Sequence, residues 1–174
     1  MFSRTKGGKD HHLNQDPLNR IHDIIKELDL IEHPEGGYYG ETYRSPYKTE
    51  DQKSVLMTSI YFLLTSESVS HFHRIKNDEL WFHHEGSPIS IHTLDNGTHH
   101  EYILGKTYGK TCRPQQLIKG NTIFGSSVLE PDSYALVSCV VSPGFEFEDF
   151  ELFTSEQLLK NFPNEKEIID RLTP

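Results

Sequence analysis

The stretch SHFHRIKNDELWFHHEG, residues 70–86, decides how the rest of the sequence is interpreted. It predicts two β-strands joined by a polar Lys-Asn-Asp turn. Side chains two residues apart on a strand point to the same face, so His71 and His73 are expected to lie side by side. Imidazoles titrate near neutral pH and are common metal ligands, so this pair indicates acid/base or metal chemistry.

The second strand of this pair carries a matching set of polar and aromatic side chains. Glu79, Trp81 and His83 alternate along it and share one face. If the face with His71 and His73 and the face with Glu79, Trp81 and His83 both point into a barrel, one wall of that barrel carries three imidazoles, a carboxylate and an indole. The alternative is a solvated sheet edge, since histidine is often only partly buried.

The sequence around this pair consists of short alternating or apolar runs separated by Gly, Pro, Asn and Asp, which is typical of an all-β sandwich or barrel. Strands are predicted at residues 38–44, 55–64, 69–73, 79–84, 89–94, 99–104, 115–118, 122–129 and 134–141. One helix is predicted from Asp16 as N-cap, through Pro17, to about Asp29. Short helices are predicted after Thr154, which can form a capping box with Gln157, and after residue 163.

The clearest turn is Asn96-Gly97, a pair that suits the positive φ angles of a tight hairpin. The hairpin histidines are expected to decorate a solvated ribbon; they are His92, His99 and His100. Further along, Cys139 lies in an apolar run and is expected to be a buried thiol. The aromatic residues of the segment 142–153 are expected to close the barrel or a subunit interface, with Glu146 in solvent.

The composition limits the class of protein. A chain of 174 residues predicts one domain, here residues 16–174, preceded by a polar, disordered arm at residues 1–15 whose His11 and His12 are given no function. A net charge of −9 argues against nucleic acid as a partner. Two cysteines, no signal-like apolar segment and no run of about twenty apolar residues predict a cytoplasmic protein without a membrane partner.

Three blocks of this sequence resemble a known family. The order His71-x-His73, five residues, Glu79, six residues, Gly86 resembles the first motif of the cupin superfamily, with one extra residue in the first gap. The blocks HPEGGYYGETYRS (residues 33–45), SHFHRIKNDELW (70–81) and SPGFEFEDFELF (142–153) resemble the Cupin_5 family, a cupin-fold domain of unknown function. The resemblance covers residues 18–162.

The resemblance implies an all-β cupin double-stranded β-helix, or jelly roll, with one N-terminal helix and short C-terminal helices. It also implies a small-molecule ligand inside the barrel and a homodimer. Metal-binding cupins usually take another histidine from a second motif, and Phe124 stands at that position here. The metal ligands implied are therefore His71, His73 and Glu79 only, and a divalent ion is a possible cofactor.

Candidate site residues follow from both arguments. The catalytic candidates are His73 as base, Glu79 as its partner, and His83 or Tyr134 as proton donor. The candidates for substrate binding are Tyr39, Glu41, Tyr43, Arg44, Trp81, Gln116 and Phe124. Three functions stay open: an isomerase- or epimerase-like acid/base enzyme acting on a sugar-like or hydroxy-acid substrate, a metal-dependent oxygenase or lyase, and a non-enzymatic barrel that binds a small ligand.

Overall fold

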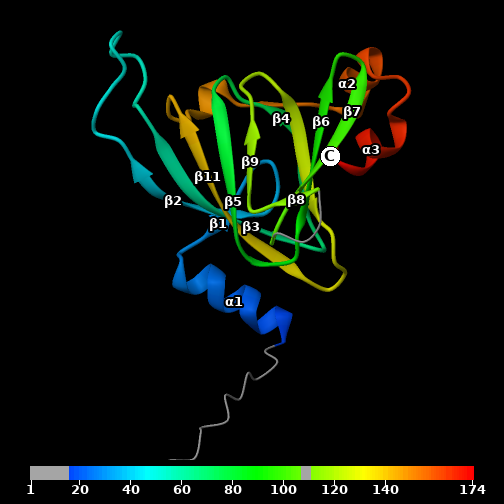
Figure 1. Cartoon of the computed structure of the whole chain (residues 1–174), viewed down its shortest axis with the longest axis horizontal. Helices are drawn as coiled ribbons and strands as arrows, with labels where there is room; N and C mark the ends of the chain where they lie inside the picture. The colour runs from blue at the N-terminus through cyan, green and yellow to red at the C-terminus, as the bar shows by residue number, and fades with distance from the viewer. Residues whose placement is uncertain (1–15, 107–110) are drawn as a thin grey trace, which may run out of the picture.

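The computed structural model describes residues 16–106 and 111–174. Within these ranges the chain forms two six-stranded sheets, which face each other across a common interior (Figure 1). The expected disordered arm, with His11 and His12, lies outside the described residues.

The first sheet has the spatial order β1-β2-β3-β11-β5-β9. Its strands are β1 (Ile31–Glu32), β2 (Tyr38–Arg44), β3 (Thr58–Thr65), β11 (Tyr134–Ser142), β5 (Asp78–Gly86) and β9 (Gln115–Ile118). The second sheet has the order β12-β4-β10-β6-β7-β8. Its strands are β12 (Glu151–Leu152), β4 (Val69–Arg74), β10 (Ile123–Val128), β6 (Ile89–Asp95), β7 (Thr98–Leu104) and β8 (Cys112–Arg113).

Consecutive strands β4 and β5 belong to different sheets, where they pair with β10 and β11. This alternation between two antiparallel sheets is the jelly-roll arrangement, and it confirms the predicted fold. The nine predicted strands are present. The two-residue strands and the 3₁₀ turn Phe147–Asp149 were not predicted, and β3 begins at Thr58 instead of residue 55. Val55 pairs instead with Lys48 inside the long β2–β3 connection, which projects from the barrel.

The predicted helices are present at both ends of the described chain. Helix α1 (Pro17–Glu27) is capped by Asp16, whose Oδ1 accepts a hydrogen bond from the Leu18 amide at 3.1 Å. Helix α2 (Ser155–Asn161) begins with the predicted capping box of Thr154 and Gln157, and α3 (Lys166–Arg171) follows. None of the helices in the described ranges is long and apolar enough to cross a bilayer.

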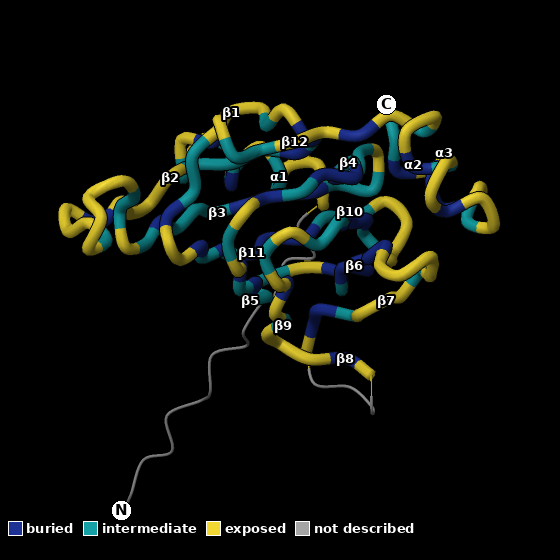
Figure 2. Tube along the Cα trace, turned by 90° about the horizontal axis from the view of Figure 1, so that it is seen from above, coloured by how far each residue is buried: buried dark blue, intermediate teal, exposed yellow. Residues whose placement is uncertain are grey.

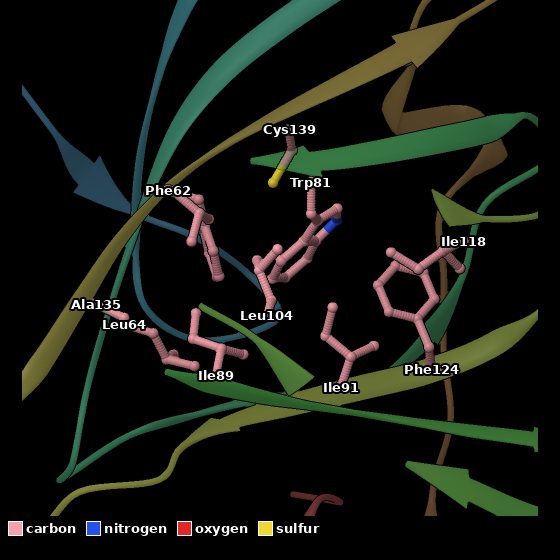
Figure 3. Packing of buried hydrophobic residues seen from close by; sticks show 11 residues of the cluster. Phe62, Leu64, Trp81, Ile89, Ile91, Leu104, Ile118, Phe124, Ala135 and Cys139 are labelled. Atoms are coloured by element: carbon pink, nitrogen blue, oxygen red, sulfur yellow. The ribbon is translucent and has the colours of Figure 1, made fainter. Parts of the chain in front are cut away.

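In the described part of the chain, buried apolar side chains form three clusters. One lies between the two sheets, and each of the other two joins one or two helices to the outer face of a sheet. The largest fills the space between the sheets, where Trp81, Phe62 and Phe124 meet with Cys139 beside them (Figure 3). A second cluster joins α2 and α3 to the outer face of the second sheet, and a third joins α1 to the outer face of the first. Buried segments therefore run through the middle of both sheets, and exposed ones lie in the connections and along outer strands such as β2 and β7 (Figure 2).

The predicted hairpin turn is present, with φ of 49° at Asn96 and 74° at Gly97. The expectation of a solvated histidine ribbon is wrong for His92, which is 3% exposed. Its Nδ1 lies 2.8 Å from Nε2 of His99, and its Nε2 faces the guanidinium of Arg171 in α3 at 3.3 Å. Helix α3 packs over this part of the sheet, which alternation along one strand could not show. His100 is exposed as expected.

Candidate functional site

A cavity of about 320 Å³ opens between β2, β3, β4, β5 and β11 and the segment 145–150. Four of its titratable lining residues are almost fully buried, each less than 10% exposed: Glu35, His73, Glu79 and Cys139. Glu41, Arg44 and Phe147 line it at solvent-exposed positions. The cavity therefore has an inner end rich in titratable groups and a mouth that reaches solvent.

A β-bulge in β4 determines which histidine reaches the cavity. Phe124 of β10 lies opposite His73, but Ser126 lies opposite Ser70, so β4 contains one extra residue between these pairs. The bulge breaks the strict alternation that would put His71 and His73 on one face. His73 lines the cavity, whereas His71 is half-buried outside its lining.

The carboxylate that meets His73 comes from the turn before β2. Glu35 Oε2 lies 2.8 Å from Nε2 of His73, and the Glu35 carbonyl accepts a hydrogen bond from the amide of His71 at 2.7 Å. Gly36 allows this approach: its φ is +109°, and a Cβ there would lie 2.0 Å from the carbonyl oxygen of Val69. The loop is therefore held against β4 at a distance that only glycine permits.

Glu35 and His73 form a buried ion pair. Burial works to lower the pKa of His73, but the adjacent Glu35 carboxylate, the His71 carbonyl and Glu79 together outweigh burial, and the pKa is raised above its usual value. Burial likewise works to raise the pKa of Glu35, but His73, with smaller contributions from His33 and Ser70, outweighs burial and the pKa is lowered. The Nδ1–H of His73 donates to the carbonyl of His71 at 2.7 Å, so both ring nitrogens are engaged.

Glu79, at the inner end of the cavity, differs from Glu35 in that its pKa is raised and not lowered. Burial raises its pKa to about 7, and the charge of Glu35 adds to this effect. Its Oε1 accepts a hydrogen bond from the indole Nε1 of Trp81 at 2.8 Å. The thiol of Cys139 contacts the same carboxyl, and burial raises the thiol pKa as well. Near neutral pH the site therefore combines an ionised Glu35–His73 pair with a carboxyl group that can either give or take a proton.

The raised pKa of Glu79 predicts a pH-dependent stability. Between its ordinary pKa of 4.5 and about 7 the folded state holds a proton that the unfolded state has lost, so stability falls as pH rises through this interval. Glu79→Gln, which keeps an acceptor for Trp81, is expected to stabilise the protein above pH 7 by roughly 3 kcal/mol relative to wild type, and to have little effect below pH 4.5. Urea denaturation at the two pH values measures this difference, and an equal effect at both would contradict it.

Arg44 lies at the mouth, where it is already engaged. Its Nε and Nη2 donate to the two carboxylate oxygens of Glu41 at 3.0 Å, its Nη1 donates to Glu146 at 2.7 Å, and its Nη2 also donates to the carbonyl of Phe145 at 3.2 Å. Arg44 therefore fastens the segment 145–150 to β2. We call these contacts of Arg44 with Glu41, Glu146 and the Phe145 carbonyl the Arg44 clamp. Glu146, which was expected in solvent, lines the cavity as part of this clamp.

Three other predicted site residues do not line the cavity. Tyr134 lies on the opposite side of the first sheet, where it packs in the cluster with α1 and its hydroxyl donates to Glu85 at 3.0 Å. His83 places its Nε2 2.9 Å from the carbonyl of Ser87, beyond Trp81 along β5. Gln116 donates to the carbonyl of Ile103 at 3.0 Å. Strand alternation separates Tyr134 from Cys139, since residues five apart face opposite ways.

The remaining predicted substrate contacts divide into three groups. Tyr39 and Glu41 line the cavity. Trp81 and Phe124 are 1% and 0% exposed and belong to the core behind it. Tyr43 is exposed outside the lining, because β2 has a register shift between Glu41 and Tyr43.

The suggested metal-ligand set does not fit this geometry. His71 is outside the cavity lining, both nitrogens of His73 are engaged, and Glu79 is held by Trp81. Across residues 16–106 and 111–174, no three His, Cys, Asp or Glu side chains are grouped so that they could hold a metal ion. Glu35 replaces Glu79 as the carboxylate partner of His73.

Comparisons with known proteins agree with this fold. A cupin jelly roll with polar groups at one end of the barrel is the class of protein that the fold and the cavity define. The model of the Cupin_5 family, described as Cupin superfamily (DUF985), matches residues 22–153, and the chain belongs to this family. The uncharacterized protein YML079W of Saccharomyces cerevisiae is 32% identical over 164 residues, which cover 84% of this chain and 81% of that protein.

Two solved structures are similar to this chain in both sequence and fold. Protein SO0799 of Shewanella oneidensis is 41% identical with a TM-score of 0.82, over 87% of this chain and 96% of that one. A hypothetical protein from Leishmania major is 37% identical with a TM-score of 0.80, over 87% and 97%. Oxalate decarboxylase of Bacillus subtilis, at 16% identity and a TM-score of 0.52 over 81% of this chain and 36% of its own, shares only the fold.

Proposed function

We propose that this cupin is an acid/base enzyme, isomerase- or epimerase-like, acting on a small polar metabolite in the cavity. One observation carries the proposal: two buried carboxyl groups, one of them paired with a buried imidazole, line the inner end of one cavity. Titratable groups whose pKa values are shifted and that border a cavity are typical of functional sites. A cavity of about 320 Å³ is at the lower end of the range for small-molecule sites.

The two carboxyl groups suit different roles. Glu79, whose pKa of about 7 matches neutral conditions, takes a proton from a carbon next to a carbonyl group, exchanges it with water that enters through the mouth of the cavity, and delivers a proton to the other face or the neighbouring carbon. The electron pair moves onto the carbonyl oxygen, and the positive charge of the His73 imidazolium, whose N–H groups stay bonded to Glu35 and the His71 carbonyl, stabilises the negative charge through space. Glu35 keeps His73 protonated, so it is a positioning residue. This exchanges the roles expected from the sequence, in which His73 was the base.

The proposal predicts a hydrogen-exchange signature that can be detected before the substrate is identified. When the protein is incubated with a cell metabolite extract in deuterium oxide, at least one metabolite is expected to gain a non-exchangeable deuterium, because the proton returned to carbon comes from solvent. Glu79→Gln is expected to slow this incorporation by at least about a hundredfold. Mass spectrometry of the extract measures it.

A matched control is Glu151→Gln, which removes an exposed carboxylate outside the cavity lining and should leave incorporation unchanged. If wild-type protein labels no metabolite, or if Glu79→Gln labels it equally fast, the acid/base assignment is wrong. A metabolite that is retained by the protein but recovered without deuterium would support the non-enzymatic ligand-binding alternative.

We also propose a homodimer in the cytoplasm. Exposed apolar side chains on and beside the projecting β2–β3 connection support association, because a second copy would cover them: Tyr43, Tyr47 and Leu56. Both cysteines, Cys112 and Cys139, are free, which suits a reducing compartment.

A further inference from the structure

The mouth of the cavity carries an excess of negative charge. Three acidic residues at exposed or half-buried positions belong to its lining, Asp29, Glu41 and Glu146. Arg44 pairs with the last two and is the only arginine or lysine among the described lining residues. Farther in, the Glu35–His73 pair is neutral as a whole, and Glu79 is largely protonated at slightly acidic pH. An anionic ligand would therefore approach like charges, and a cationic one would approach opposite charges.

Arg44 does not offset this excess for an incoming anion. Four of its five N–H groups are already used by Glu41, Glu146 and the Phe145 carbonyl. Binding a carboxylate or phosphate in bidentate fashion would require breaking this clamp. Arg44, a candidate for substrate binding in the sequence, therefore has little of its guanidinium free for an anionic ligand.

The walls of the mouth are aromatic. His33 contacts Tyr39 edge to face, with ring centroids 4.6 Å apart, and lies 6.0 Å from Phe147. Phe147 contacts Phe145 at 4.9 Å and is itself 49% exposed beside the cavity. Ring faces carry a negative quadrupole, so an aromatic wall next to carboxylates favours a positively charged group at the same place.

We propose that the cavity binds a small organic cation, with its ammonium group at the aromatic and acidic mouth and its reactive end directed toward Glu79. The geometry points to this class because charge and aromatic walls coincide at the mouth, while the acid/base groups lie at the buried end. The inference rests on the cavity of the proposed function and adds the charge class of the ligand. Of the two substrate classes expected from the sequence, a sugar-like molecule and a hydroxy acid, it disfavours the hydroxy acid, and it narrows the sugar-like class to molecules that carry an amine.

Three probes of similar size test the charge preference without turnover. They are choline, its tert-butyl analogue, in which carbon replaces the ammonium nitrogen, and pivalate. Choline is expected to bind at least about fivefold more tightly than the uncharged analogue, and pivalate is expected to bind most weakly. Added salt is expected to weaken the binding of choline but not that of the other two probes. Chemical-shift titration of the wild-type protein measures all three. Absence of saturable choline binding, or equal or tighter binding of either other probe, would overturn the inference.

Two variants locate the binding site. Phe147→Leu and Glu146→Gln are each expected to weaken choline binding by at least about threefold, since one removes a ring face and the other a negative charge. Their controls are Tyr102→Leu, a similarly exposed ring on β7, and Glu151→Gln, an exposed carboxylate; both lie outside the cavity lining and should change nothing. Equal effects of test and control variants would show that choline binds elsewhere. Deuterium incorporation that persists without choline binding would refute this inference and leave the acid/base proposal intact.

Discussion

Glu35→Gln is expected to lower the free energy of unfolding by about 3–5 kcal/mol, because it leaves the buried His73 imidazole without its charged partner. The side chains of Glu35 and His73 are 7% and 3% exposed, so water cannot replace the lost contact. The Gln side chain keeps the size of Glu, which separates the charge effect from packing. The pKa of His73 should then fall below its ordinary value, since burial is no longer opposed by the carboxylate.

The pH dependence of this effect follows from the two pKa shifts. A lowered pKa at Glu35 contributes stability above its ordinary value of 4.5, and this is lost as pH falls through the folded pKa. A raised pKa at His73 contributes stability below its ordinary value of 6.5, and this is lost as pH rises through the folded pKa. The difference between wild type and Glu35→Gln should therefore be largest between pH 4.5 and 6.5.

Urea denaturation at pH 5.5 and imidazole titration by NMR check this expectation at about the middle of that window. The control is Glu151→Gln, which breaks the ion pair between Glu151 and Arg74. These two side chains are 52% and 37% exposed, so the substitution should lower the free energy of unfolding by less than about 1 kcal/mol. If Glu35→Gln is no less stable than this control, or if His73 still titrates above its ordinary pKa, the buried pair does not exist as described.

Much of the fold follows from short-range patterns in the sequence. Strand alternation placed the nine main strands, Asn96-Gly97 placed a hairpin turn, and Thr154 with Gln157 placed the start of α2. Each of these signals depends on residues that are neighbours along the chain, so no tertiary contact is needed to interpret it. The alternation of Ala135, Val137 and Cys139 into the core also places Tyr134 on the other face.

The candidate functional site is built from contacts between residues that are distant along the chain, and short-range sequence patterns do not predict such contacts. Glu35 precedes β2 in a turn and meets His73 from a distant part of the chain. The bulge in β4 changes which side chain points inward, and nothing in Ser70–His73 marks its position. His33 and Glu35 stand in the block HPEGG, and the two glycines there were the available signal, because adjacent glycines often permit a close backbone approach.

Gly36→Ala tests whether that close approach builds the site. A Cβ at Gly36 would lie 2.0 Å from the Val69 carbonyl oxygen, and its φ of +109° is unfavourable for an L-residue. Because the obstacle is backbone on the neighbouring strand, the turn must move away from β4, and we expect a loss of about 2–5 kcal/mol from clash and strain together.

The matched control is Gly97→Ala, where φ is also positive, at +74°, but a Cβ would meet no atom of the described residues within 4 Å. It should cost only the strain, about 1–3 kcal/mol. In the fraction of Gly36→Ala that folds, Glu35 is displaced, so the pKa of His73 should fall as in Glu35→Gln, whereas Gly97→Ala should leave it unchanged. Loss of folded protein for Gly36→Ala alone would also agree with the expectation. Equal stability of the two variants, with an unchanged His73 titration, would mean that the close contact between this turn and β4 does not hold Glu35 in the cavity.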